Sequence, residues 1–215
     1  MGISCYRIRI FLRKLDTKFP AAARKALRVL FSLIAPGSLL VRPMRYNTVC
    51  EKIPGQYVQG LKDLLSYIQG HIGKAGSMVE VGSYAGESTE IFATAFQTVY
   101  AVDPWAEFRM KHIEKKFDER AKRKPNIIKM KKFSADAASF FQDESLDFVY
   151  LDARHDYASV KNDIHHWLPK IKERCFIGGH DYNEGEKVGV IRAVDEMFGK
   201  PDKVFMDSSW VKQIG

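Results

Sequence analysis

The chain has 215 residues, of which 46% are hydrophobic, 12% aromatic and 28% charged. This is the composition of a globular domain with a buried core, and it excludes a disordered chain, a collagen-like repeat and a polytopic membrane protein. The three cysteines, Cys5, Cys50 and Cys175, lack CxxC spacing, so they indicate neither a disulfide framework nor a zinc site and fit a reducing, cytoplasmic compartment.

The excess of positive charge lies mainly at one end of the chain. The formal net charge is +8, and ten Lys or Arg stand against one acid between Met1 and Tyr46, so this segment carries +9 and the remainder −1. A second basic run, Arg109 to Lys132, has eleven Lys or Arg against three acids. Its apolar residues recur at helical spacing, which favours a solvated helix face.

Residues 3–34 predict two short amphipathic helices with arginines and lysines on their polar sides. We therefore assign residues 1–50 to a basic helical extension. Its most apolar stretch, residues 26–41, is interrupted by charge and by a Pro-Gly pair, and it is shorter than the roughly 20 residues that span a bilayer. Two interpretations of residues 1–46 stay open: peripheral contact with an anionic membrane, or docking on the core or on a partner.

From Ile53 onward, helical patterns alternate with short β-rich runs, which is typical of a parallel sheet with crossover helices. Residues 51–215 are therefore predicted to form one α/β domain with a Rossmann-like, doubly wound, mostly parallel sheet and helices on both faces. We expect strands near residues 77–81, 98–102, 126–130, 146–151, 174–177, 203–206 and 210–213. We expect helices near residues 57–72, 106–123, 135–140, 159–168 and 188–198, and one that runs through Ile91 and Phe92.

A glycine turn follows the first predicted strand. Gly82 and Gly86 stand four residues apart in the sequence MVEVGSYAGEST, at the start of the next helix. In a doubly wound sheet this loop faces the ligand crevice, where glycine lets a ligand approach the backbone. The spacing differs from that of dinucleotide and phosphate loops, and no lysine follows Gly86, so a nucleotide-like ligand with less negative charge is favoured.

Four acids accompany four successive strands: Glu80, Asp103, Asp136 and Asp152. A single acid at a strand end usually caps a helix or sits in a turn. Four acids in register with a glycine turn favour a ligand site instead, because the carboxyl ends of parallel strands meet at one edge. There, Asp103 can accept hydrogen bonds from both hydroxyls of a ribose.

With these motifs, residues 55–215 resemble the class I S-adenosylmethionine-dependent methyltransferases. The resemblance implies a seven-stranded sheet whose last strand is antiparallel, with S-adenosylmethionine as cofactor and S-adenosylhomocysteine as product. Trp105 has two interpretations, a cover for the ribose or adenine and a hydrophobic cap on the following helix. The cofactor-binding residues that the resemblance implies are Glu80, Gly82, Ser83, Tyr84, Gly86, Ser88, Asp103, Trp105, Ser134, Ala135, Asp136 and Asp152.

The segments DARHDY from Asp152 and GGHDYN ending at Asn183 narrow the resemblance. They are similar to the branch of small-molecule and sugar O-methyltransferases and cephalosporin-hydroxylase-like proteins (methyltransferase 24-like). This branch implies that Asp152, His180 and Asp181 bind a divalent metal, Mg²⁺ or Mn²⁺. Arg154 stands where the sugar enzymes have an acidic base, so His155 is our candidate for that role.

We therefore predict His155, His180 and Asp152 as catalytic residues. A divalent cation lowers the pKa of an acceptor hydroxyl, and an imidazole can take its proton. The alternative is metal-free: Asp181 caps the next helix and His180 is the base.

The function that the sequence favours is methyl transfer from S-adenosylmethionine to a hydroxyl of a small molecule, saccharide or glycolipid-like acceptor. Two alternatives stay open. One is an RNA methyltransferase that uses the basic segments, although no RNA-binding module supports nucleic acid as a partner. The other is a non-catalytic protein attached to a membrane or partner through residues 1–46. The sequence is compatible with a homo-oligomer. It is also compatible with a cytoplasmic location, with or without attachment to a membrane surface.

Overall fold

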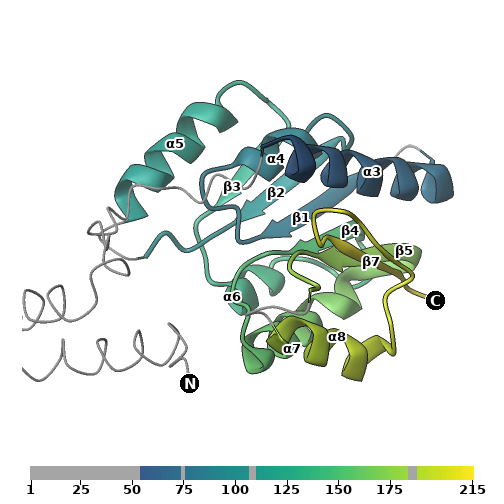
Figure 1. Ribbon diagram of the computed structural model, residues 1–215. Helices are drawn as coiled ribbons and strands as arrows, with labels where there is room; N and C mark the ends of the chain where they lie inside the picture. Colours follow the sequence, from purple (N-terminus) through teal and green to yellow (C-terminus); the bar gives the residue numbers. More distant parts are fainter. Residues whose placement is uncertain (1–53, 74–75, 107–109, 184–187) are drawn as a thin grey trace, which may run out of the picture. The chain divides into compact units, whose positions relative to one another are not determined.

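The structure is a computed structural model, and it describes residues 54–73, 76–106, 110–183 and 188–215. The predicted N-terminal extension, its two helices, Cys5 and Cys50 lie outside the described residues. The described part forms three layers, with a central sheet covered by α3, α4 and α5 on one face and by α6, α7 and α8 on the other (Figure 1). The helices are α3 (Pro54–Ile72), α4 (Glu87–Phe92), α5 (Lys111–Ala121), α6 (Ser134–Ala138), α7 (Tyr157–Trp167) and α8 (Val188–Phe198). The strands are β1 (Ser77–Val81), β2 (Thr98–Val102), β3 (Ile127–Met130), β4 (Leu146–Leu151), β5 (Ile171–Gly179), β6 (Lys203–Val204) and β7 (Trp210–Gln213).

The sheet confirms the predicted doubly wound class. Its seven strands follow the order β3-β2-β1-β4-β5-β7-β6. β1 to β5 pair in parallel, whereas β7 pairs antiparallel with both β5 and β6. The chain order reverses between β1 and β4, which is where ligands bind in open α/β sheets.

Each face of the sheet buries its own apolar cluster. On the first face, α3 contributes Leu61, Leu64 and Ile68, all fully buried, and these pack with side chains of β1, β4 and β5. On the second face, Ile164 and Trp167 of α7 pack against β4, β5 and α8. All six residues of β4 are buried, as expected for a central strand covered on both sides.

Several predicted boundaries differ from the structure; β6, for example, ends at Val204 rather than at residue 206. α5 begins at Lys111 rather than near residue 106. β5 begins at Ile171 rather than at residue 174; Ile171 pairs with Leu146 of β4, and an irregularity in the register separates this pair from that of Phe148 and Phe176. α6 ends at Ala138 and is shorter than predicted.

Within the part of the chain that the structure describes, no helix combines the length and the apolar character needed to cross a bilayer.

Candidate functional site

The loops after β1, β2, β4 and β5 begin side by side at the carboxyl edge of the sheet. The amide of Gly82 donates to the carbonyl of Val102 at 2.8 Å, so the first loop leaves β1 against the end of β2. The amide of Asp152 donates to the carbonyl of Val81 at 2.8 Å, and the amide of His180 donates to the carbonyl of Leu151 at 3.1 Å. Gly82, Asp152 and His180 therefore share one edge.

Gly82 is the point where the glycine turn touches the loop after β4. Its φ is 95°, a left-handed conformation, and a Cβ there would overlap the carbonyl oxygen of Asp152 and lie 2.7 Å from the Cα of Ala153. Gly86 also has a positive φ, of 83°, but a Cβ there would meet the ring of Phe117 at 2.9 Å. A side chain at Gly82 would therefore collide with backbone atoms, whereas a side chain at Gly86 would collide with another side chain.

Asp103 ties the loop after β2 to the glycine turn. Its carboxylate accepts the amide of Tyr84 at 3.0 Å and the amide of Trp105 at 2.8 Å. Tyr84 and Trp105 both have left-handed φ values, 46° and 40°. Burial raises the pKa of Asp103, and the two amide donors oppose this rise. The predicted ribose-binding acid thus has a fixed position at the edge.

Trp105 lies in the second of its two predicted positions. The side chain is buried, and its ring packs on Phe117 of α5 with the ring centroids 4.8 Å apart. Its indole Nε1 donates to the carbonyl of Tyr84 at 2.8 Å. Arg120 of α5, which the sequence analysis did not single out, holds the next carbonyl, that of Ala85, at 2.9 Å. Trp105 and Arg120 therefore hold the turn from outside.

Glu80 lies inside β1, fully buried, rather than at the open edge. Its carboxylate accepts hydrogen bonds from the hydroxyls of Ser88 and Thr89 on α4. Burial raises the pKa of Glu80 to about 7, while these hydroxyls oppose the rise. The predicted cofactor residue Ser88 thus faces Glu80, and Thr89 is a partner that no sequence motif indicated.

The predicted adenine-contacting residues lie in the first turn of α6. Ser134 Oγ accepts the indole Nε1 of Trp167 at 2.9 Å, while Asp136 is exposed. The amide of Asp103 donates to the carbonyl of Met130 at 3.3 Å, so this turn begins beside the end of β2. The third acid is therefore at the predicted edge, and Ser134 also fastens α7.

Asp152, His155 and Asp181 form a polar cluster at the edge. His155 Nε2 lies 2.8 Å from an oxygen of Asp181 and 3.6 Å from an oxygen of Asp152. One potential ligand atom from each residue lies within 4.8 Å of the others. Two carboxylates and one imidazole form a donor set suited to a divalent cation.

His180 lies beside this cluster and outside it. Its Nδ1 is 3.1 Å from an oxygen of Asp181, and its Nε2 is 3.9 Å from an oxygen of Asp207 in the β6–β7 loop. Asp181 has a φ of 64°. The predicted metal set of Asp152, His180 and Asp181 thus differs from the observed cluster, in which His155 takes the place of His180.

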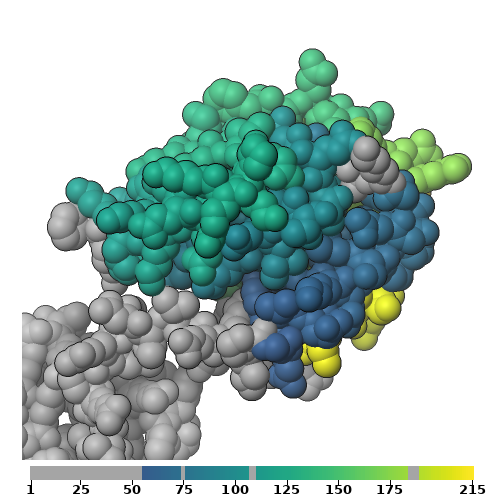
Figure 2. All heavy atoms as spheres, turned by 90° about the horizontal axis from the view of Figure 1, so that it is seen from above, coloured from purple at the N-terminus to yellow at the C-terminus, as the bar shows by residue number. Residues whose placement is uncertain are grey.

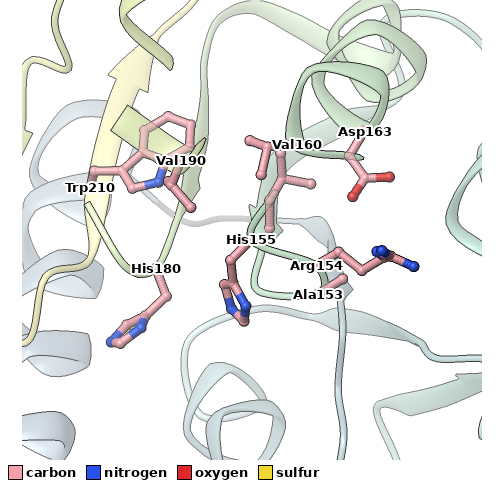
Figure 3. A pocket seen from close by; sticks show the side chains of 9 residues that line it. Ala153, Arg154, His155, Val160, Asp163, His180, Val190 and Trp210 are labelled. Atoms are coloured by element: carbon pink, nitrogen blue, oxygen red, sulfur yellow. The ribbon is translucent and has the colours of Figure 1, made fainter. Parts of the chain in front are cut away.

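A small pocket adjoins the cluster on the α7 and α8 side (Figure 3). The imidazoles of His155 and His180 both point away from Trp210 and Val190, whereas the side chain of Arg154 extends to solvent. The residues that line it are Leu151, Ala153, Arg154, His155, Val160, Asp163, His180, Val190 and Trp210.

Comparison with known families relates this site to a methyltransferase domain. Residues 79–182 match a family model described as a methyltransferase domain. This range contains the glycine turn, Asp103 and the cluster of Asp152, His155 and Asp181. A curated protein of Sinorhizobium fredii, the uncharacterised protein y4gI, is 35% identical over 52 residues. That match covers 24% of this chain and 6% of the relative's length.

Solved structures share the fold at low sequence identity. An O-methyltransferase from Bacillus cereus, in complex with S-adenosylhomocysteine, aligns with a TM-score of 0.52 and 18% identity over 91% of this chain and 92% of that one. Spermidine synthase from Thermotoga maritima aligns with a TM-score of 0.55 and 10% identity over 74% of this chain and 60% of that one. Two proteins with different names fit equally well, so these likenesses establish the fold and leave the reaction to the site.

Proposed function

The chain carries the methyltransferase domain of the class I, S-adenosylmethionine-dependent enzymes, and we propose that it methylates a hydroxyl oxygen of a small molecule, saccharide or glycolipid-like acceptor. The single observation that carries this proposal is the position of the Asp152, His155 and Asp181 cluster, which touches the glycine turn through the Gly82–Asp152 backbone contact. A methyl donor bound at the turn and an oxygen held at the cluster would be neighbours.

The cofactor we propose is S-adenosylmethionine. Its sulfonium and ammonium groups are cations, and the edge of the sheet is rich in carboxylates, which favours a cationic ligand. Asp103 would bind the ribose, because its carboxylate keeps acceptor capacity beyond the two amides of Tyr84 and Trp105. Gly82 would keep the glycine turn close to the loop after β4, because a side chain there would overlap the backbone of Asp152 and Ala153.

The acceptor oxygen would lie at the cluster. Asp152, His155 and Asp181 are the residues that would hold a divalent cation, since their ligand atoms converge within 4.8 Å. When bound, the cation would lower the pKa of the acceptor hydroxyl and fix its oxygen. The imidazole makes Mn²⁺ or Fe²⁺ a better fit than Mg²⁺, which prefers oxygen ligands. In this proposal His155 is a ligand rather than the base predicted from the sequence.

Calorimetric titration with S-adenosylmethionine and S-adenosylhomocysteine tests the cofactor proposal. We expect the wild type to bind both and Asp103→Ala to lose most of its affinity, because the ribose contact and the hold on Tyr84 both disappear. Asp143→Ala is the matched control, since that acid is exposed and pairs only with Lys170 on the surface. A folded wild type that binds neither ligand would contradict the proposal.

The cation is tested separately by Mn²⁺ binding, measured by electron paramagnetic resonance, and by activity on hydroxylated acceptors. We expect Asp152→Asn and Asp181→Asn to weaken Mn²⁺ binding at least tenfold, because each removes a charged ligand. Activity should fall after EDTA treatment and return with added metal. Full activity in EDTA would leave His155, paired with Asp181, as the base and would overturn the metal assignment.

A further inference from the structure

Tyr57 on α3 lies between the two halves of the site, although it stands outside the matched range 79–182. Its hydroxyl is hydrogen-bonded with Ser88, on the side of the glycine turn. Its ring meets the imidazole of His180 edge-on, with the centroids 5.6 Å apart and the planes at 73°. A single side chain thus touches both the cofactor side and the acceptor side of the edge.

The position of Tyr57 is fixed by the packing of α3. Leu61 and Leu64, on the buried face of this helix, are fully buried. Gly60 packs so closely on the β6–β7 loop that a Cβ there would lie 2.6 Å from the Cβ of Asp207 and closer still to its carboxylate. Figure 2 shows the C-terminal part of the chain beside α3, in agreement with this contact. The helix therefore presents Tyr57 to the site as a rigid element.

The surroundings of the phenol are negatively charged. The carboxylates of Asp152, Glu80 and Asp207 all act on its hydroxyl. Together with burial, which is the largest cause, they raise the pKa of Tyr57 far above its usual value, so the phenol stays neutral and protonated. A neutral oxygen among carboxylates is a favourable place for a positive group of a ligand and an unfavourable one for an anion.

We propose that the phenol oxygen of Tyr57 contacts a cationic group of the bound S-adenosylmethionine. This inference rests on the proposed cofactor. The cofactor carries two cations, the ammonium and the sulfonium, and the oxygen can accept a hydrogen bond from the first or lie against the polarised methyl group of the second. Tyr57 then orients the methyl donor toward the cluster of Asp152, His155 and Asp181.

The test is calorimetric titration of Tyr57→Phe with three ligands: S-adenosylmethionine, S-adenosylhomocysteine and 5′-methylthioadenosine. The last has neither cation. We expect S-adenosylmethionine to bind about tenfold more weakly, as for the loss of one hydrogen bond to a charged group, and 5′-methylthioadenosine to bind unchanged. Because all three titrations use the same variant, a general loss of folding would affect them together.

The result for S-adenosylhomocysteine identifies the cation. Unchanged binding assigns the contact to the sulfonium, and an equal loss assigns it to the ammonium. Tyr67→Phe is the matched control on the same helix, because Tyr67 packs on Phe176 and Phe205 away from the edge, and it should leave all three affinities unchanged.

Two outcomes would overturn the inference. Equal weakening of 5′-methylthioadenosine would mean that Tyr57 only supports the fold of the turn through Ser88. Unchanged S-adenosylmethionine binding would mean that the phenol makes no contact. If the wild type binds none of the three ligands, the cofactor proposal fails first and this inference with it.

Discussion

Single residues differ sharply in how much change the edge of the sheet can accept at their positions. Gly82 and Gly86 look equivalent in the sequence, since both follow the first strand and both adopt a positive φ. Their neighbours are not equivalent. Gly82 faces the backbone of Asp152 and Ala153, which cannot move without breaking the pairing of β1 and β4, whereas Gly86 faces the ring of Phe117.

We expect Gly82→Ala to abolish cofactor binding and to destabilise the fold by about 3 kcal/mol or more, through overlap with backbone and a strained φ. Gly86→Ala should cost about 1–2 kcal/mol and keep measurable binding, because a side chain can shift. Urea unfolding and titration with S-adenosylhomocysteine measure both. Equal losses in the two variants would contradict this ranking.

Glu80 gives the unliganded protein a pH dependence of known sign. Its pKa is raised from 4.5 to about 7, so between these values the folded chain holds a proton that the unfolded chain releases. This extra proton adds about 3 kcal/mol to the free energy of unfolding. The contribution is fully present below pH 4.5 and is lost as the pH rises through 7.

Glu80→Gln removes this titration while keeping a neutral side chain between Ser88 and Thr89. Relative to the wild type, the variant should therefore gain about 3 kcal/mol of unfolding free energy between pH 4.5 and pH 7.5. Urea unfolding across this range measures the gain, with the exposed Glu173→Gln as control. A difference that does not vary with pH would show that Glu80 titrates normally.

The sequence predicted which residues stand at the strand ends of the site better than it predicted which side chains contact one another. Gly82, Asp103 and Asp152 follow directly from strand ends, and the structure brings them to one edge. The presence of His155 in place of His180 in the cluster did not follow, because it depends on where side chains of the loops after β4 and β5 lie in space, which no periodicity predicts.

Contacts between residues that are distant in the sequence could not be predicted either. Arg120 reaches the carbonyl of Ala85 across 35 positions, and Trp105 is buried by a helix whose start the pattern placed too early.

Among the elements, β5 has little room for side chains at its carboxyl end. Gly178 and Gly179 lie where β5 pairs with both β4 and β7. A Cβ on Gly178 would lie 2.5 Å from the carbonyl oxygen of Trp210 and 3.1 Å from the ring of Phe148. The strand thus needs glycine for close approach, although its φ is ordinary.

Gly178→Ala should destabilise the protein by about 2 kcal/mol, since the added methyl group has to push β7 away from β5. The same substitution at Gly70, on the exposed side of α3 with no atom within 4 Å of a Cβ, should be neutral or stabilise by about 0.5–1 kcal/mol. Thermal unfolding of both variants tests the pair. A stable Gly178→Ala would indicate that β7 is less firmly paired than described.

Element types were predictable where the hydrophobic pattern was strong, and their ends were not. β4 reads as a continuous apolar run, and its predicted range of 146–151 agrees with the structure. β5 starts with the buried Ile171, but the exposed Glu173 and Arg174 interrupt its apolar pattern, so the pattern indicated only the later part of the strand. Tertiary pairing, which a local pattern does not contain, determines such ends.

At the scale of the whole molecule, charge is unevenly divided. Residues 1–46 carry +9, whereas the rest of the chain is nearly neutral. We propose that this segment contacts an anionic membrane surface on the cytoplasmic side, since basic residues near such a surface each contribute about 1 kcal/mol of attraction.

We expect the full chain to co-sediment with phosphatidylserine vesicles at low salt, to dissociate near about 0.5 M salt as charges are screened, and to lose binding on deletion of residues 1–46. Vesicles of neutral phosphatidylcholine are the control. Salt-sensitive binding to RNA that is lost with the same deletion, without binding to vesicles, would favour the nucleic-acid interpretation instead.

The hydrogen bonds that Asp103 accepts from Tyr84 and Trp105 also have a thermodynamic consequence for ligand recognition. They hold two left-handed residues in place before any ligand arrives, so the conformational entropy of this turn is lost when the chain folds rather than when it binds. The heat of binding should therefore reflect contacts and released water more than loop ordering. Trp105→Phe, which removes the indole donor to the carbonyl of Tyr84 and leaves Asp103 in place, should keep those contacts and still bind more weakly, with the loss appearing in the entropy.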